Sequence, residues 1–211
     1  MEYVTFNRMR IKGETMKLIE SLEFIFEREE FLSAQFGIAK RDVLEALDGL
    51  YGTISWLKQS IFQSVLKDVT FFFSDEPINF PGELELYESE KFEPIIYVNI
   101  MTVVEDFYKR EFVLEMNKET ATCYEYAAFV CLHEFGHLVH GLIGGTGELK
   151  RDRLLDYFER GQYYYERFIA FMNQGDTMKE KKRYRNIPHE KAADSFARQY
   201  VPYVLLDRSI E

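Results

Sequence analysis

The chain has 211 residues, of which 46% are hydrophobic and 16% aromatic, enough apolar material for a packed core and too much for a disordered chain. The formal net charge is −10, so we do not expect direct binding of nucleic acid by phosphate neutralisation. The densest basic run, 179–185, is typical of a solvated loop or helix end. The length suits one domain, or a compact domain with a helical appendage.

The cysteines and the N-terminus indicate the compartment. Cys123 and Cys131 would lie about 12 Å apart along a helix, too far for a disulfide, so we expect buried thiols in a reducing environment. Residues 1–13 lack the apolar stretch of a signal peptide. We expect no window of the sequence to be apolar enough over the length needed to cross a bilayer. The prediction is therefore a cytoplasmic protein that does not associate with membranes.

Helical periodicity dominates the first third of the chain. Apolar residues recur at spacings of three and four over 16–31, 43–47 and 54–66, between charged residues. We expect these segments to form an N-terminal helical region over 1–68 that packs on, or covers, a second region over 69–211.

The middle of the chain changes to short strands. The segments 69–73, 83–87 and 93–100 are rich in β-formers or alternate in polarity, and turn residues separate them. They predict a small twisted sheet of three strands, antiparallel or mixed. The strand over 95–99 is our candidate for an edge that binds an extended substrate by main-chain pairing.

The last half returns to helix. We expect a long helix from Asn117 or Thr120 to Leu142, a Tyr-rich helix over 151–174, and a final helix over 188–206. The predicted fold class is therefore α+β and mostly helical, with the small twisted sheet packed on the long helix.

The strongest chemical signal is the motif HExxH at 133–137. His133 and His137 are four residues apart, so on a helix both imidazoles project from one face and can reach one tetrahedral zinc ion. Glu134 follows the first histidine and is suited to take the proton of a water molecule that attacks a carbonyl. Apolar neighbours on both sides place the motif in the middle of a helix.

A catalytic zinc site needs a third protein ligand and one open position. A metzincin would have a third histidine where this chain has Ile143, which excludes that class. Glu190 is the better candidate, and Asp194 lies one turn further on the same helical face, where it could orient a ligand imidazole. His189 is the main rival of Glu190. His140 is expected on the helix surface or in a substrate cleft.

A developing oxyanion also needs a hydrogen-bond donor. Several tyrosines between the two ligand segments are candidates, although each could equally serve in packing. They are Tyr157, Tyr163, Tyr164, Tyr165 and Tyr184.

With these residues in place, the chain resembles the gluzincin metallopeptidases and most closely the ImmA/IrrE family. Three segments carry the resemblance. The segment 95–99 (IIYVN) is similar to the family's strand with a terminal Asn, 127–141 (AAFVCLHEFGHLVHG) to its zinc helix, and 190–202 (EKAADSFARQYVP) to its Glu-x-x-Ala-Asx-x-Phe-Ala run. The interval between the second and third segments is longer than we expect for that family.

The resemblance implies a zincin-like α+β fold. It also implies that His133, His137 and Glu190 are zinc ligands, Glu134 the catalytic base and Asp194 an orienting residue. It implies a zinc-dependent endopeptidase that cuts a protein substrate, such as a transcriptional repressor or another regulator in a phage, mobile-element or stress-response setting. Two alternatives stay open. The chain could be a catalytically silent zincin-fold binding module in a regulatory or toxin–antitoxin pair, or the histidines could be surface residues that bind no metal.

Overall fold

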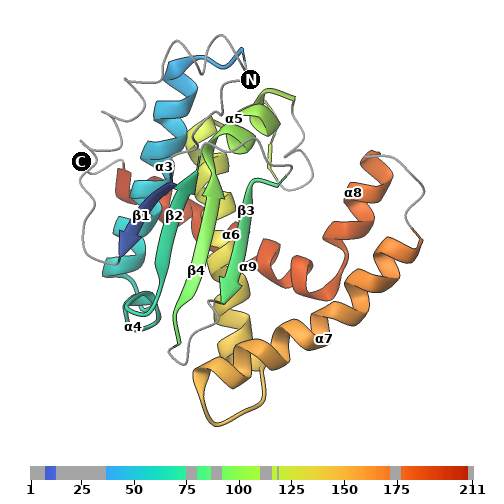
Figure 1. Cartoon of the computed structure of the whole chain (residues 1–211). Coiled ribbons are helices and arrows are strands. Elements are labelled where there is room, and N and C mark those ends of the chain that lie inside the picture. Colours follow the sequence, from blue (N-terminus) through green and yellow to red (C-terminus); the bar gives the residue numbers. More distant parts are fainter. Residues whose placement is uncertain are drawn as a thin grey trace, which may run out of the picture.

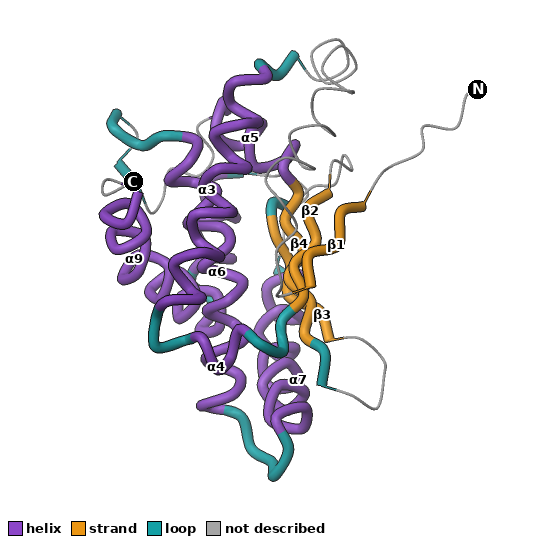
Figure 2. The backbone as a smooth tube through the Cα atoms, turned by 90° about the vertical axis from the view of Figure 1, so that its left-hand side faces the viewer, coloured by secondary structure: helices purple, strands orange, loops and turns teal. Residues whose placement is uncertain are grey.

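The described residues of this computed structural model form a mixed sheet with helices packed on one of its faces, as two views at right angles show (Figures 1 and 2). The structure describes residues 8–12, 37–74, 80–86, 92–109, 116–117, 119–171 and 177–208. The predicted helix over 16–31 lies outside these residues.

The sheet has four described strands in the order β1-β2-β4-β3. Strands β2 and β4 pair in parallel, and the two outer pairings, β1 with β2 and β3 with β4, are antiparallel. The three predicted strands are confirmed as β2, β3 and β4, and β1 joins them from the N-terminal region, where no strand was predicted. The strands are β1 (Arg8–Lys12), β2 (Thr70–Ser74), β3 (Gly82–Leu86) and β4 (Pro94–Asn99).

Strand β4 lies inside the sheet, so the prediction that 95–99 forms an edge was wrong. Five of its six residues are buried and only Tyr97 is half-buried, as expected for a central strand that lies between β2 and β3 and packs against α6. Its continuous apolar run was a sign of this central position. In the described sheet the edges are β1 and β3.

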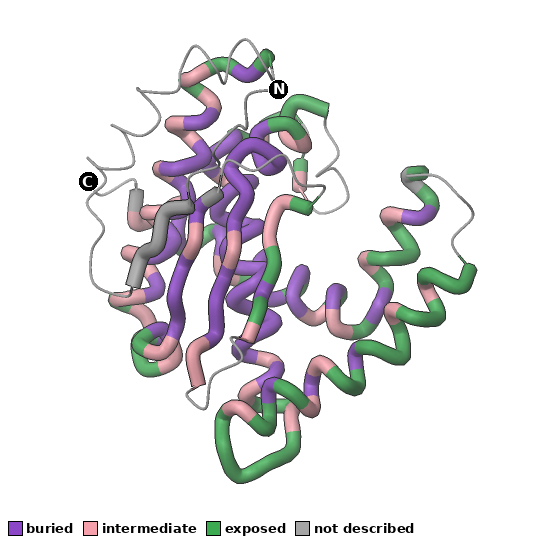
Figure 3. The backbone as a smooth tube through the Cα atoms, in the orientation of Figure 1, coloured by how far each residue is buried: buried purple, intermediate pink, exposed green. Residues whose placement is uncertain are grey.

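The helix α6 (Cys123–Gly144) forms the centre of the fold and is buried along most of its length (Figure 3). It begins after Thr122, whose side chain accepts a hydrogen bond from the Glu125 N–H at 3.1 Å, so the predicted starts at Asn117 and Thr120 were wrong. It packs against the inner side of β3 and β4 and against α3 (Lys40–Gln59).

Among the described residues, α6 is the helix whose length and hydropathy would suit a membrane span, but 78% of that stretch is buried inside the fold. The expectation that no window would reach this apolar length was therefore wrong. Its apolar character is explained by its position in the core. Both cysteines are free and buried on this helix, as predicted.

The first predicted region contributes to the same core as the second. Val43, Leu47 and Leu50 of α3 belong to one hydrophobic cluster with Leu132 and Phe135 of α6. A short helix, α4 (Gln63–Leu66), then leads into β2. The division into regions 1–68 and 69–211 stays a prediction.

The remaining helices complete the chain. Helix α5 (Ile100–Lys109) follows β4 directly, and α9 (Pro188–Arg208) packs along α6. Between α6 and α9 the chain forms α7 (Lys150–Ala170) and α8 (Met178–Arg185), which we call the α7–α8 arm. The arm projects to one side of the sheet and is largely exposed (Figures 1 and 3). The basic run 179–185 lies in α8, which Thr177 caps.

Candidate metal centre

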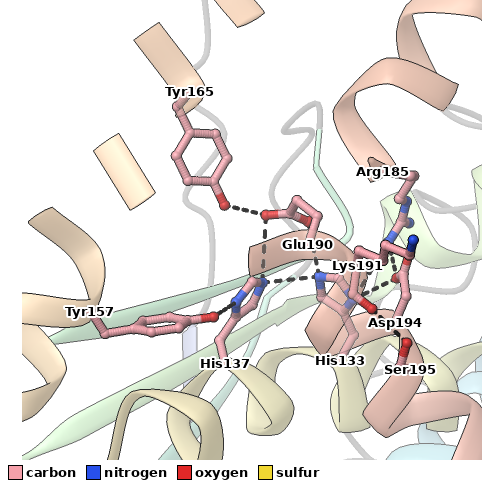
Figure 4. Close-up of polar contacts among 9 residues, drawn as sticks. All are labelled: His133, His137, Tyr157, Tyr165, Arg185, Glu190, Lys191, Asp194 and Ser195. Carbon is pink, nitrogen blue, oxygen red and sulfur yellow. Dashed lines mark hydrogen bonds and ion pairs between the residues drawn. The ribbon is translucent and has the colours of Figure 1, made fainter. Parts of the chain in front are cut away.

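Helix α6 brings the two motif histidines together, as the spacing predicts. The Nε2 atoms of His133 and His137 lie 3.2 Å apart, and both side chains are buried (Figure 4). Since the two residues are one helical turn apart on one face, this arrangement follows from the backbone of α6.

Helix α9 supplies the third group. Glu190 lies in its first turn, just after Pro188, and is only 2% exposed. The two helices approach closely because α6 carries Gly136 at the crossing. A Cβ added there would lie 3.2 Å from the Ala193 Cα and 3.1 Å from the Phe196 Cβ of α9.

These three side chains fit a metal ion. Glu190 Oε2 lies 3.2 Å from His133 Nε2, and Glu190 Oε1 lies 3.5 Å from His137 Nε2. A tetrahedral zinc ion with bonds near 2.05 Å places neighbouring ligand atoms roughly 3.3 Å apart. Three buried donor groups at these separations could hold a metal ion, and they are the set that meets this geometry among the described residues.

The ring nitrogens that face away from this point have their own partners. Nδ1 of His133 donates to Oδ1 of Asp194 at 2.8 Å. Nδ1 of His137 lies 3.1 Å from the hydroxyl oxygen of Tyr157, which accepts its proton when Nε2 faces a metal. Such contacts fix the tautomer and orientation of ligand imidazoles. Asp194 therefore lies in contact with His133, where a residue that orients this imidazole would lie.

Arg185 is a residue of this site that the sequence did not indicate. Its Nη1 donates to Oδ1 of Asp194 at 2.6 Å, so the buried carboxylate has a cation on one side and His133 on the other. Burial lowers the pKa of the Arg185 guanidinium, but Asp194 and other anionic partners outweigh this effect and hold the pKa above its ordinary value. The α7–α8 arm is therefore tied to the candidate metal site through Asp194.

The protonation of the cluster follows from its charges. Burial lowers the pKa of His133, but the hydrogen bonds to Asp194 and Glu190 outweigh it and raise the pKa to about 9. Burial, and then the neighbouring His133 charge, lower the pKa of His137 to about 3. Burial raises the pKa of Glu190, but the hydrogen bond from His133 and both nearby histidines lower it to about 2. Without a metal, His133 carries the proton of the cluster.

Glu134 lies beside the ligands and under the edge strand. It is 7% exposed. Burial raises the pKa of its carboxyl to about 7, and this effect outweighs the nearby His133 charge, which lowers the pKa. Gly82 of β3 faces it so closely that a Cβ there would lie 2.9 Å from Glu134 Cγ and 3.0 Å from Oε1. Gly82, which has no side chain, leaves the space in which the carboxylate sits.

A cleft with a volume of about 390 Å³ opens onto these residues between β3 and the α7–α8 arm. Three of the five candidate tyrosines line it: Tyr157, Tyr165 and Tyr184. The Tyr165 hydroxyl donates to Oε1 of Glu190 (Figure 4), and burial raises the pKa of that hydroxyl. Tyr163 and Tyr164 are exposed on α7.

The other two histidines do not join the ligand group. His189 lines the cleft, and its ring packs edge-on against Tyr157 with 4.3 Å between centroids. His140 is half-buried and contacts the ring of Phe196.

Comparison with protein-family models, with curated proteins and with solved structures found no match, so any functional assignment rests on the geometry of the chain itself.

Proposed function

We propose that this chain is a zinc-dependent endopeptidase of the gluzincin type, which hydrolyses peptide bonds in a protein substrate. The observation that carries the proposal is the convergence of His133, His137 and Glu190 at tetrahedral separations, with Glu134 beside them at the cleft. Two imidazoles and one carboxylate are a donor set that zinc takes in catalytic sites, where a fourth position stays open.

The chemistry divides between the ion and the chain. Zinc, when bound, polarises a carbonyl oxygen and lowers the pKa of a water molecule. Glu134 accepts the proton of the attacking water and passes it to the leaving amine. Asp194 and Tyr157 hold the two imidazoles in orientation through their Nδ1 atoms.

Tyr165 is the candidate that we assign to the developing oxyanion. Its hydroxyl lies against Glu190 and it lines the cleft. Because its pKa is raised, the hydroxyl keeps its proton near neutral pH and remains a donor.

The substrate strand would pair with β3. This strand is an edge of the described sheet, its residues Gly82, Glu83 and Leu84 line the cleft, and Gly82 faces Glu134. An extended peptide that adds to this edge lies next to the metal site. The backbone nitrogens of a cleaved peptide can be methylated one at a time. We expect hydrolysis to be blocked at every second position, where the N–H group would donate to β3. Uniform tolerance of N-methylation would contradict the pairing.

The identity of the substrate is proposed on resemblance alone: a repressor or another regulatory protein in the cytoplasm. The alternative of a silent binding module needs no base beside the metal. The burial of Glu134 at the cleft supports the catalytic proposal.

The test is a peptide library digested by zinc-loaded wild-type protein and by Glu134→Gln, with cleavage products identified by mass spectrometry. We expect Glu134→Gln to keep its zinc and to lose on the order of 10²–10⁴-fold in rate. Glu159→Gln, at an exposed carboxylate of α7, is the matched control and should cleave normally. Unchanged cleavage by Glu134→Gln would refute the mechanism. Absence of any cleavage by zinc-loaded wild type would refute the endopeptidase proposal.

A further inference from the structure

Two of the three candidate ligands are bonded directly to the α7–α8 arm (Figure 4). The hydroxyl oxygen of Tyr157 lies 3.1 Å from Nδ1 of His137, and the Tyr165 hydroxyl donates to Oε1 of Glu190. Both tyrosines lie on α7, about two turns apart, and both line the cleft. Helix α7 therefore reaches two ligands that come from different helices, α6 and α9.

The third candidate ligand is connected to the arm through Asp194. Nδ1 of His133 and Nη1 of Arg185 donate to the same oxygen, Oδ1 of Asp194, at 2.8 Å and 2.6 Å. The Asp194 side chain is only 1% exposed, so its charge has to be matched inside the protein. A displacement of α8 would take away the cation that matches it.

The distal half of the arm, residues 162–171 and 177–185, has no apolar anchor among its described residues. The core cluster takes Leu154 and Tyr157 from the first half of α7 but no described residue of the distal half. Every apolar side chain described there is half-buried or exposed, and Figure 3 shows this part projecting away from the sheet. Segments with few buried apolar contacts open locally at low cost in free energy.

Polar contacts with residues of the metal site link the distal half to the body of the fold. Tyr165 and Arg185 donate to Glu190 and Asp194, whereas the ring contacts of Tyr184 with α7 lie within the arm. A bound metal ion would hold the carboxylate of Glu190 and the imidazole beside Asp194 in fixed positions. The acceptors on which the arm depends would then be fixed as well.

We propose that Tyr157, Tyr165 and Arg185 are positioning residues, one for each candidate ligand, and that metal binding and attachment of the arm therefore stabilise each other. Thermodynamic linkage requires the two effects to be equal in size. A substrate or partner that moves the arm thus changes the affinity of the site for its metal. This inference rests on the proposed function in one respect, namely that the three candidate ligands bind zinc.

The test is hydrogen–deuterium exchange of the full chain, followed by mass spectrometry, in zinc-loaded and in chelator-treated protein. We expect zinc to slow amide exchange in the distal half of the arm by at least about tenfold, because the arm opens less often when its acceptors are fixed. This readout needs no hydrolysis. Zinc content and melting temperature are measured on the same samples.

Two variants each remove one contact of the arm. Tyr165→Phe and Arg185→Gln should each reduce the zinc-dependent slowing to less than about threefold. Arg185→Lys should keep part of it, because lysine retains a charged donor for the buried carboxylate. Tyr164→Phe and Arg183→Gln are the matched controls, since both residues are exposed on the same two helices, and they should keep the wild-type slowing.

Zinc affinity, measured by chelator competition, is the reciprocal readout. Tyr165→Phe changes no charge, so its affinity should fall by the same factor as the slowing, although excess zinc still fills the site. If Tyr165 served only to pack the arm, exchange would rise equally with and without zinc and the affinity would stay unchanged. Arg185→Gln is left out of this comparison, because the loss of a cation also strengthens the attraction of the site for a metal ion.

The coupling would be overturned if zinc-loaded wild type exchanged its distal arm as fast as the chelator-treated protein. Full slowing in Tyr165→Phe or in Arg185→Gln would overturn it too, and so would an equal loss in the control variants. Either variant is sufficient for this comparison if the other does not fold.

Cleavage of library peptides by the same samples separates the coupling from the catalytic proposal. Zinc-dependent slowing in a protein that cleaves no peptide would keep the coupling and remove the endopeptidase. Cleavage by a protein whose arm does not respond to zinc would keep the endopeptidase and remove the coupling. A protein that takes up no zinc would remove both.

Discussion

Replacing Gly82 by alanine tests how the edge strand positions the carboxylate of Glu134, the proposed catalytic base. The new Cβ would lie 2.9 Å from Glu134 Cγ, 3.0 Å from Oε1 and 3.0 Å from Val130 Cγ1. Carbon atoms in contact are separated by about 3.5–4.0 Å, so either Glu134 or β3 must move by roughly 0.6 Å or more. The candidate metal ligands lie on α6 and α9 and need not move if the Glu134 side chain or β3 shifts.

The expected effect is a loss of rate without a loss of metal. A displacement of about 1 Å at a reacting group can cost on the order of 10²-fold, so we expect kcat/KM of Gly82→Ala to fall by roughly 10- to 100-fold. Zinc content should match that of wild type.

The assay compares steady-state hydrolysis of one library-derived fluorogenic peptide by wild type, Gly82→Ala and the control Gly144→Ala, with zinc measured in the same samples. Gly144→Ala makes the same chemical change in open space and should retain wild-type activity. If Gly82→Ala hydrolyses the peptide at the wild-type rate, Glu134 does not depend on the space beneath β3 and its position as the base is in doubt.

Three further outcomes are expected from the contacts of the metal centre. Asp194→Asn removes the carboxylate that accepts a hydrogen bond from His133, so zinc affinity should fall roughly 10- to 100-fold. Chelator competition measures this affinity, and an unchanged value would count against the orienting role. Zinc binding at pH 7 should release a proton, because the metal-free pKa of His133 is about 9 and its ligating form is neutral; affinity therefore falls as the pH drops below about 9. Calorimetry in buffers of different ionisation enthalpy measures this release, and buffer-independent heats would refute it. Tyr165→Phe should lower kcat by on the order of 10²–10³-fold with little change in zinc content, whereas wild-type kcat would exclude Tyr165 as the oxyanion donor.

The group of side chains that could hold a metal ion was predictable because its geometry is local. The spacing of His133 and His137 determines their common face on any helix, and Glu190 with Asp194 repeats the same spacing on a second helix. The pairing of those two helices could be expected only because a catalytic zinc site needs a third ligand. The strands β2, β3 and β4 were likewise visible as local patterns of polarity and turn residues.

The features that were missed depend on which elements meet in space. Arg185 belongs to a basic run, and no periodicity distinguishes it as the partner of Asp194. The pairing of β1 with β2 joins residues 8–12 to 70–74, across a separation for which a single sequence carries no register signal. Gly82 acts through the space that it leaves for Glu134, and that space is defined by side chains from another element.

The long interval between His137 and Glu190 has a structural explanation. It contains α7 and α8, which line one side of the cleft and bring Tyr157, Tyr165 and Arg185 to the candidate metal centre. The length of this interval alone would have suggested an insertion with no part in the site. The contacts to Glu190 and Asp194 make the arm part of the site.

The most direct test is the metal content of the purified protein, measured by elemental mass spectrometry beside His137→Ala and Glu190→Ala. We predict about one zinc ion per chain in the wild type and a clear loss in both variants, because each removes one of three ligands. A wild type that takes up no zinc after reconstitution, or variants that keep it fully, would contradict the metal centre on which the proposed function depends.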